Sequence, residues 1–387
     1  MIPYGKQQIT EQDIAAVVST LQSDYLTQGP AVAEFEQNFA RYVGSRYAVA
    51  VSNGTAALHL AVMALGLEAG GRIITTPITF AASANCARYV GGELAFADIN
   101  PDTLTLDLRR VRFLLESFPK GTYKGIVPVD FAGYPVDMEA FRALADEFGV
   151  FLLEDACHAP GGYFTDSKEQ KQTCGNGLAD AAIFSFHPVK HIACGEGGMI
   201  TTNRSDVYEK LLLLRTHGIT KNPAQMQRNE GGWYQEMITL GYNYRMPDIL
   251  AALGNAQLQR ADENLARRQI IAQRSIAAFK DLPIEYTHVP EDIQHAYHLF
   301  VIQTDQRKAL YDYLHQQQIY VQVHYVPCHL HPYYRQQGWR EGDYRHAEYY
   351  YSRCLSLPMY HALTDSEQDY VIEKVRVFFS GQTPKSS

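Results

Sequence analysis

The feature that most limits how this chain can fold is an alternation of short apolar runs with helical patterns between residues 10 and 215. Apolar runs of this length, mostly separated by helices, are typical of buried strands in a largely parallel sheet that lies between layers of helices. The sequence therefore predicts an α/β domain with a mostly parallel seven-stranded sheet. The seven runs are YAVAV at 47–51, RIITT at 72–76, ELAFA at 93–97, GIVPV at 125–129, VFLLE at 150–154, AAIFSF at 181–186 and GMITT at 198–202.

Two helices are expected ahead of the first strand. Thr10 is a suitable N-cap for the first, and Pro30 stands at a first-turn position of the second, which Gly44 ends. These helices belong to the same unit as the sheet.

The length of the chain calls for a second unit. A single hydrophobic core stops growing at roughly 250 to 300 residues, and this chain has 387. We predict a large domain at residues 1–246 and a smaller α+β domain at residues 247–387. The smaller domain would begin with a long connecting helical stretch and continue with a strand-like run at 298–303, a helix near 306–317, a second run at 319–325 and two further helices.

Charge and composition exclude several classes of function. A net charge of −8 and a pI near 6.0 argue against nonspecific nucleic-acid binding. No apolar run reaches the roughly 18 residues of a membrane span, so we expect a cytoplasmic protein that binds neither nucleic acid nor membrane. The six cysteines are scattered without a CxxC pair, and no histidine cluster is completed by other ligands, so we expect neither disulfides nor a metal site.

Three stretches carry residues suited to chemistry. In VAVSNGTAALHLAV a strand ends at Val51 and a helix begins near Thr55, which places free backbone N–H groups and the positive end of a helix dipole at the turn. This turn is a phosphate site or an ordinary helix cap. In VFLLEDACHA a strand delivers Glu154 and Asp155 to its carboxyl end, where α/β proteins bind ligands, although an acid there is often only solvated.

The third stretch is FSFHPVKHIACGEGG at 184–198. Pro188 stops the preceding strand, so Lys190 is expected on a loop above the sheet. Taken alone, a loop lysine is most often a surface charge. Together the three stretches place a phosphate cradle, a carboxylate and an amine at strand ends of one sheet, which is what pyridoxal phosphate requires. Burial and a nearby cation should then lower the pKa of Lys190.

Nine motifs along nearly the whole chain resemble those of the nucleotide-sugar aminotransferases in the fold-type I pyridoxal phosphate superfamily. Within that family the chain looks most like the branch that acts in pseudaminic acid biosynthesis. The motifs are LTQGP, SNGTAALHLA, TPITFAASANC, EDACHA, FSFHPVK, GEGGM, RTHGI, GYNYRMPDI and VHYVPCHLHPYY.

The resemblance implies a role for each matching residue. Lys190 is implied as the Schiff-base lysine and Asp155 as the partner of the pyridine nitrogen. The remaining cofactor contacts implied are His158 and Phe80 at the ring, with Gly54, Thr55, Ser185 and, from a second subunit of a homodimer, Asn243 at the phosphate. The residues implied on the nucleotide-sugar side are Tyr4, Arg245, His324, Tyr325 and Tyr333.

The resemblance also implies the reaction, with L-glutamate as amino donor and a UDP-linked 4-keto-6-deoxy-N-acetylhexosamine as acceptor. Family members with histidine at the lysine position carry out dehydration instead, and this chain keeps Lys190. Alternatives are amino transfer to another 4-keto or 3-keto sugar carried by UDP or dTDP, a sugar dehydratase, an amino-acid or amine aminotransferase, and a noncatalytic binding protein. A nucleophile built from Cys157 and His158 ranks lowest, because neighbours at an extended strand end point apart.

Overall fold

The seven predicted strands form one sheet in a computed structural model that describes residues 1–381, so the last six positions of the predicted smaller domain lie outside it. The strand order is β1-β9-β8-β5-β4-β2-β3, and β9 is the one strand that runs opposite to the other six. The predicted mostly parallel sheet is confirmed. Its strands are β1 (Tyr47–Val51), β2 (Arg72–Thr75), β3 (Glu93–Phe96), β4 (Tyr123–Val127), β5 (Phe151–Asp155), β8 (Ala181–Ser185) and β9 (Gly198–Thr202).

The reversed direction of β9 follows from its connection to β8. Parallel neighbours need a crossover of a dozen or more residues that usually contains a helix. Residues 186–197 contain no helix, so β9 turns back beside β8. Since β1 is also antiparallel to β9, β1 runs parallel to β8, and the carboxyl ends of β1, β5 and β8 meet at one edge.

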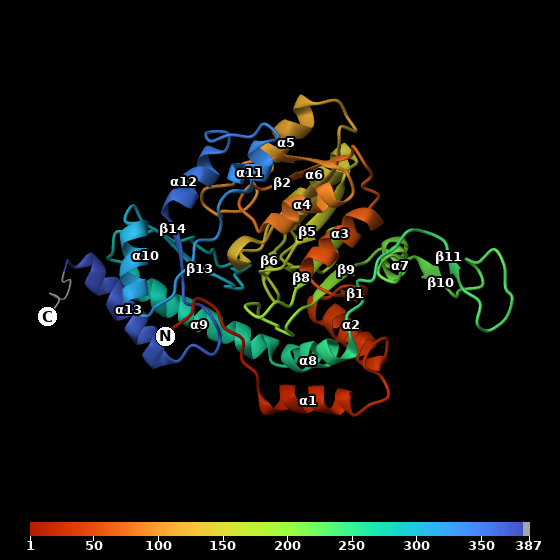
Figure 1. The fold of residues 1–387 in the computed structure, drawn as a ribbon. Coiled ribbons are helices and arrows are strands. Elements are labelled where there is room, and N and C mark those ends of the chain that lie inside the picture. Colours follow the sequence, from red (N-terminus) through yellow and green to blue (C-terminus); the bar gives the residue numbers. More distant parts are fainter. Residues whose placement is uncertain (382–387) are drawn as a thin grey trace.

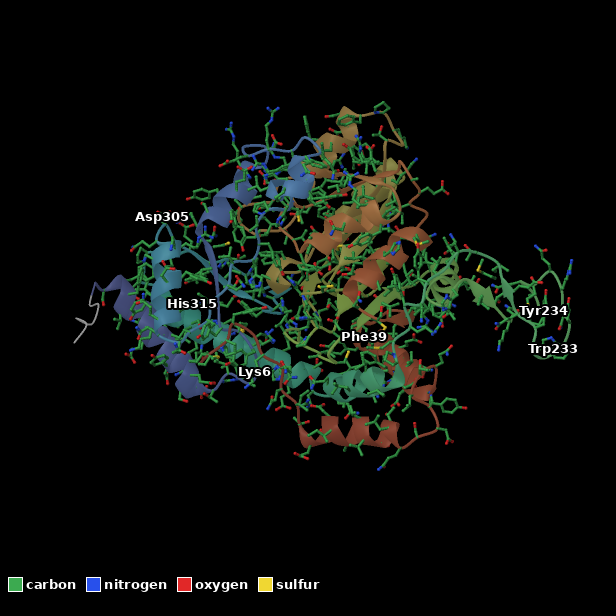
Figure 2. All side chains as sticks on the ribbon, in the orientation of Figure 1. Lys6, Phe39, Trp233, Tyr234, Asp305 and His315 are labelled. Carbon is green, nitrogen blue, oxygen red and sulfur yellow. The ribbon has the colours of Figure 1, made fainter. Side chains whose placement is uncertain are left out.

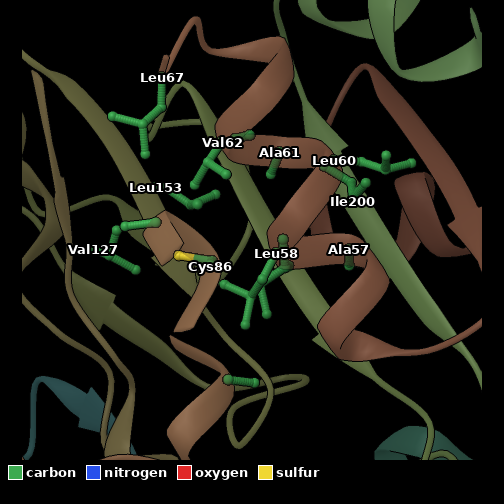
Figure 3. Packing of buried hydrophobic residues seen from close by; sticks show 14 of the residues in the cluster. Ala57, Leu58, Leu60, Ala61, Val62, Leu67, Cys86, Val127, Leu153 and Ile200 are labelled. Atoms are coloured by element: carbon green, nitrogen blue, oxygen red, sulfur yellow. The ribbon is translucent and has the colours of Figure 1, made fainter. Parts of the chain in front are cut away.

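The two faces of the sheet pack against different helices. Alternate strand residues such as Leu153, Ile183 and Ile200 pack under α3, as Figure 3 shows for Leu153 and Ile200. Their neighbours Leu152 and Phe184 point to the opposite face and are also buried, as expected for a sheet covered on both sides. Helices on the first face are α3 (Gly54–Ala64), α4 (Ala81–Tyr89) and α7 (Ser205–Leu214), and those on the second are α2 (Pro30–Val43), α5 (Leu108–Ser117), α6 (Met138–Phe148) and α8 (Asp248–Leu258).

The first two helices begin and end as predicted. Helix α1 (Glu11–Leu21) has Thr10 as N-cap in a capping box with Asp13, and α2 ends at Gly44 in the left-handed conformation, with φ at 81°. The N-terminus of α2 is capped from a distance, because the Asp248 carboxylate accepts hydrogen bonds from the N–H groups of Gly29 (2.8 Å) and Ala31 (2.9 Å).

The C-terminal part differs from the prediction in three respects. The connecting stretch is two helices, α8 and α9 (Ala261–Phe279), separated at Gln259 and Arg260. Residues 319–325 are not a strand, since only isolated bridges join Ile319 to Ile2 and Gln322 to Ser356. A strand that the pattern missed, β14, pairs with β13, and three helices follow 319–325 instead of two. These elements are β13 (Phe300–Gln303), α10 (Arg307–Gln316), α11 (Pro332–Arg335), α12 (Arg345–Arg353), β14 (Cys354–Leu357) and α13 (Asp365–Phe379).

Several short elements complete the fold. A small sheet joins β6 (Tyr163–Thr165) to β7 (Lys171–Thr173) and β12 (Ile293–Gln294), and β10 (Ile219–Thr220) pairs with β11 (Glu236–Met237). Single 3-10 turns are η1 (Phe131–Gly133) and η2 (Cys328–Leu330). The β10–β11 hairpin projects from the body of the molecule, with Trp233 and Tyr234 near its far end (Figures 1 and 2).

The predicted boundary at residue 246 stays a prediction, and one contact crosses it. Ile2 is buried in the core that α9, α10 and α13 form, so the start of the chain packs with the C-terminal unit. None of the helices in residues 1–381 combines the length and the apolar character needed to cross a membrane.

Candidate active site

A cavity of about 660 Å³ lies at the carboxyl ends of β1, β5 and β8. This is the edge of the sheet at which the three chemistry-bearing stretches were expected to meet. Ten of the thirteen predicted site residues line the cavity: Tyr4, Gly54, Thr55, Phe80, Asp155, His158, Ser185, Lys190, His324 and Tyr325.

The other three predicted residues do not line this cavity. Asn243 and Arg245 lie on the segment after the hairpin, where they form isolated bridges with Thr216 and Val51. Tyr333 is on α11 and 55% exposed. Asn243 was expected to act on the cavity of a second subunit, and the roles of Arg245 and Tyr333 likewise stay predictions.

The turn between β1 and α3 forms one wall of the cavity. Asn53 caps α3 by accepting a hydrogen bond from the Ala56 N–H (2.8 Å), and the N–H groups of Gly54 and Thr55 open the helix, where no intrahelical acceptor exists for them. The turn packs tightly on its surroundings: a Cβ added at Gly54 would lie 3.0 Å from Ser185 Cβ. These features suit a phosphate group.

Asp155 ends β5, is buried, and has its two carboxylate oxygens held from different elements. The Ser83 hydroxyl donates to Oδ2 (2.6 Å) and the Cys157 N–H to Oδ1 (3.2 Å). Ser83 stands on the first turn of α4 and lines the cavity. The prediction missed it, although it lies within the ITFAAS motif, three residues after Phe80.

Lys190 lies on the loop between β8 and β9, where its N–H donates to the His187 carbonyl (2.8 Å). Burial lowers the pKa of Lys190, as predicted, and the Arg268 guanidinium lowers it further, while Cys157 and Asp155 act in the opposite direction. A larger fraction of this amine is therefore neutral near pH 7 than in a free lysine, and a neutral amine is the form that attacks a carbonyl.

A backbone N–H group determines which ring nitrogen of His158 carries the hydrogen. The Ala132 N–H donates to Nδ1 (3.2 Å), so Nε2 carries the hydrogen and faces the Tyr325 hydroxyl at 3.3 Å. Burial, with Lys190 nearby, holds the pKa of His158 well below its usual value, and the ring is neutral. His298, which the prediction missed, packs on it with ring centroids 4.2 Å apart.

Aromatic rings line the far side of the cavity. Tyr4 packs on His324 with ring centroids 5.2 Å apart, and the ring centroids of Tyr325 and Phe80 are 6.3 Å apart. His324 Nδ1 and Ser356 Oγ are 2.8 Å apart, and burial lowers the pKa of His324 to about 4. Phe80 is 61% exposed, which leaves its ring face free for a planar group.

Cys157 and His158 do not point apart, contrary to the expectation for neighbours at an extended strand end. Both residues line the cavity, because the chain leaves the extended conformation after Asp155. Burial and the Asp155 carboxylate nevertheless raise the pKa of the Cys157 thiol well above its usual value, which keeps it protonated and weakly nucleophilic.

A helix N-terminus, a buried carboxylate and a half-buried amine around one cavity suit the phosphate, ring nitrogen and carbonyl of pyridoxal phosphate. The comparison with known proteins agrees. The model of the DegT/DnrJ/EryC1/StrS aminotransferase family matches residues 7–376. The chain belongs to this family, and it is a pyridoxal-phosphate-dependent sugar aminotransferase, so the predicted fold type, enzyme class and cofactor are confirmed.

Individual relatives match over almost the full chain. SpsC, a spore coat polysaccharide biosynthesis protein of Bacillus subtilis, is 40% identical over 389 residues, which cover 98% of this chain and 97% of SpsC. PseC of Helicobacter pylori, an aminotransferase involved in the biosynthesis of pseudoaminic acid, is 30% identical with a TM-score of 0.88 and coverage of 98% and 99%. Spr1654 of Streptococcus pneumoniae, solved in its PMP form, is 28% identical with a TM-score of 0.89 and coverage of 99% and 100%.

Proposed function

We propose that this aminotransferase moves an amino group from L-glutamate to the C4 ketone of a UDP-4-keto-6-deoxy-N-acetylhexosamine. The product is UDP-4-amino-4,6-dideoxy-N-acetyl-β-L-altrosamine, an intermediate of pseudaminic acid biosynthesis. The observation that carries the proposal is the half-buried Lys190 amine, with a lowered pKa, in one cavity with Asp155 and the N-terminus of α3.

The sugar part of the proposal rests on motif resemblance and on the likeness to PseC. The higher identity to SpsC favours a second candidate, which is amino transfer to another keto nucleotide sugar used for a surface polysaccharide. Both candidates use the same residues at the reacting end of the cavity and differ in the sugar that the aromatic side must accept.

Each cavity residue has a task in this reaction. When bound, pyridoxal phosphate supplies a carbonyl that exchanges amino groups and a ring that accepts electrons. The N-terminus of α3, with Ser185, would hold its phosphate, and Asp155 would hold the positive charge of its ring nitrogen. Lys190 would hold the carbonyl carbon through its neutral Nζ until the amine of the donor displaces it. The freed Nζ would then take a proton on the donor side and return it on the acceptor side.

The remaining groups fix orientation and exclude water. His158 is neutral with its hydrogen on Nε2, so it donates a hydrogen bond into the site without adding a second charge beside Lys190. Tyr4 is tied to the C-terminal unit because its carbonyl accepts from the Met359 N–H (2.9 Å). The N-terminal segment therefore closes the side of the cavity that would face the sugar.

We include a homodimer in the proposal. The β10–β11 hairpin is an arm that extends away from its own subunit and carries exposed apolar side chains (Figure 2). Exposed side chains of this size on a projecting arm indicate a partner surface, and the segment that follows leads to Asn243. The exposed fractions are 77% for Trp233, 66% for Met237 and 69% for Leu240. Sedimentation should give the mass of a dimer, and Trp233→Ser should promote dissociation; a monomer at all concentrations would contradict this part.

The first experiment tests the donor half of the reaction. The full-length protein is mixed with pyridoxal phosphate, and its absorption is recorded before and after L-glutamate. We expect a visible band that glutamate converts to near-ultraviolet absorption, and no visible band in Lys190→Ala. A parent protein without the band would refute the role of Lys190.

The second experiment tests the sugar. The glutamate-treated protein is incubated with candidate 4-keto nucleotide sugars, each carried by UDP or dTDP, and the products are identified by NMR. Amination of the L-arabino UDP sugar supports the pseudaminic acid pathway, and amination of only other sugars supports the second candidate.

A cytoplasmic location for this enzyme remains part of the proposal.

A further inference from the structure

Two carboxyl groups and a thiol meet inside the protein behind Asp155. Glu154 precedes Asp155 on β5, and consecutive strand residues point to opposite faces, so Glu154 points away from the cavity. There it meets Asp130 and Cys174, and their side-chain O and S atoms lie within 4.8 Å of one another. Asp130 is 0% exposed and Glu154 is 1% exposed. The proposed reaction uses none of the three.

The hydrogen-bond donors at this cluster are too few for two ionised carboxylates. The Gly175 N–H donates to both oxygens of Glu154 (3.1 and 3.0 Å), and the Val136 N–H donates to Asp130 Oδ1 (2.9 Å). Asp130 Oδ2 is buried without a donor. Within residues 1–381 neither carboxyl group forms an ion pair with a basic side chain. Two adjacent buried negative charges with this environment are strongly disfavoured.

One proton shared by the two carboxyl groups would relieve both the missing hydrogen bond and the repulsion between two buried charges. It supplies a donor where an oxygen has none and reduces the charge of the pair from two to one. We propose that Asp130 and Glu154 share one proton and act as a positioning pair for the cofactor site.

The pair joins the strand ends that carry two cavity residues. The Asp130 N–H donates to the Asp155 carbonyl (3.1 Å), and Asp130 opens the turn Phe131–Gly133. In that turn the Ala132 N–H fixes the ring of His158. The shared proton therefore holds the ends of β4 and β5 together and aims Asp155 and His158. This inference rests on the proposed function only for the roles of those two residues.

The shared proton has a consequence for stability. The Cys174 thiol faces the pair directly, and the Asp155 carboxylate and the Cys157 thiol act on it through charge from the cavity side. Burial raises the pKa of Asp130 from 3.8 to about 7, and burial beside Asp130 raises the pKa of Glu154. At pH values between 3.8 and about 7, the two pKa values of Asp130, the folded protein holds a proton that the unfolded chain releases. Its stability contribution is complete at low pH and is lost as the pH rises toward 7, and the unfolding constant increases up to about tenfold per pH unit.

The test compares this pH dependence in the parent and in single variants. Urea unfolding of the full-length protein, with and without pyridoxal phosphate, is followed from pH 5 to pH 8. We expect Glu154→Gln and Asp130→Asn to lose the part of the dependence in which stability falls as the pH rises, because an amide donates the hydrogen bond without a titrating proton. Buried histidines such as His158 and His324, whose pKa values are lowered, act in the opposite direction in the parent and the variants alike, so the difference between their slopes is the quantity compared. Glu68→Gln, at an exposed carboxyl, is the matched control and should keep the parent's slope. An unchanged slope in both amide variants would overturn the proposal.

A measurement on the parent keeps the proposal testable if the variants do not fold. Infrared spectroscopy at pH 6 should show the carbonyl stretch of a buried protonated carboxyl group, and its absence would overturn the proposal. So would a stoichiometric metal ion in the purified protein, since the same three side chains can bind one.

The affinity for pyridoxal phosphate tests whether the Asp130 and Glu154 pair positions the cofactor site. Glu154→Leu keeps the volume but loses the hydrogen bond, and it should weaken pyridoxal phosphate binding at least about tenfold more than Glu154→Gln does. Equal affinities would refute the positioning role. If the parent itself does not bind pyridoxal phosphate, the proposed function fails, while the slope and the infrared band still decide the shared proton.

Discussion

A methyl group added at Gly198 gives the sharpest test of whether the turn between β1 and α3 holds the phosphate. It stands at the start of β9, paired with Val51 on β1 and Ser185 on β8. A Cβ there would lie 2.4 Å from the Asn53 carbonyl oxygen and 2.9 Å from the Gly54 nitrogen. Both neighbours are backbone atoms, so no side-chain rotation can relieve the contact.

The size of the effect follows from this geometry. Contacts of Cβ below 3.0 Å essentially do not occur, so the turn at Asn53 must move by at least about 0.6 Å. Overpacking of this kind costs about 1 to 3 kcal/mol, and here the displaced atoms are those that would hold the phosphate. We expect Gly198→Ala to lower the free energy of unfolding by that amount and to weaken pyridoxal phosphate binding about 5- to 150-fold.

The assay is a titration with pyridoxal phosphate followed by absorbance, together with urea unfolding, on three variants. Gly232→Ala is the matched control, because a Cβ there meets nothing within 4 Å. Gly54→Ala should fall between the two, since its Cβ would meet Ser185 Cβ at 3.0 Å. Parent-like affinity and stability in Gly198→Ala would refute the assignment of this turn as the phosphate site.

Three further predictions follow from the geometry. Lys190→Ala should abolish amino transfer in a product assay while still binding pyridoxamine phosphate, and turnover at the parent's rate would contradict the assignment. Because burial lowers the pKa of Lys190, the rate of pyridoxal phosphate incorporation, followed by absorbance, should rise with pH and reach its midpoint below the ordinary lysine value of 10.5; a midpoint at or above 10.5 would contradict this. Asp248→Ala removes the acceptor for the N–H groups of Gly29 and Ala31 and should cost about 1 to 3 kcal/mol in urea unfolding, whereas the exposed Asp24→Ala should change little.

Local patterns were sufficient where a segment is defined by its own residues. All seven apolar runs are strands of the central sheet, and Thr10, Pro30 and Gly44 mark helix ends, because burial and capping depend on side chains close in sequence. The same patterns failed in the C-terminal unit. Residues 319–325 alternate like a strand, yet β13 pairs with β14 instead, and a choice between pairing partners is made by residues far apart in the chain.

The sequence by itself determined that the turn before α3, an acid and a lysine lie at one edge of a parallel sheet, since parallel strands bring their carboxyl ends together. Only the tertiary structure decided what surrounds them. Ser83 reaches Asp155 from α4, and Asp130 meets Glu154 across two strands. Such contacts depend on strand order and helix placement, which arise from packing over the whole domain and leave no periodic mark on the sequence.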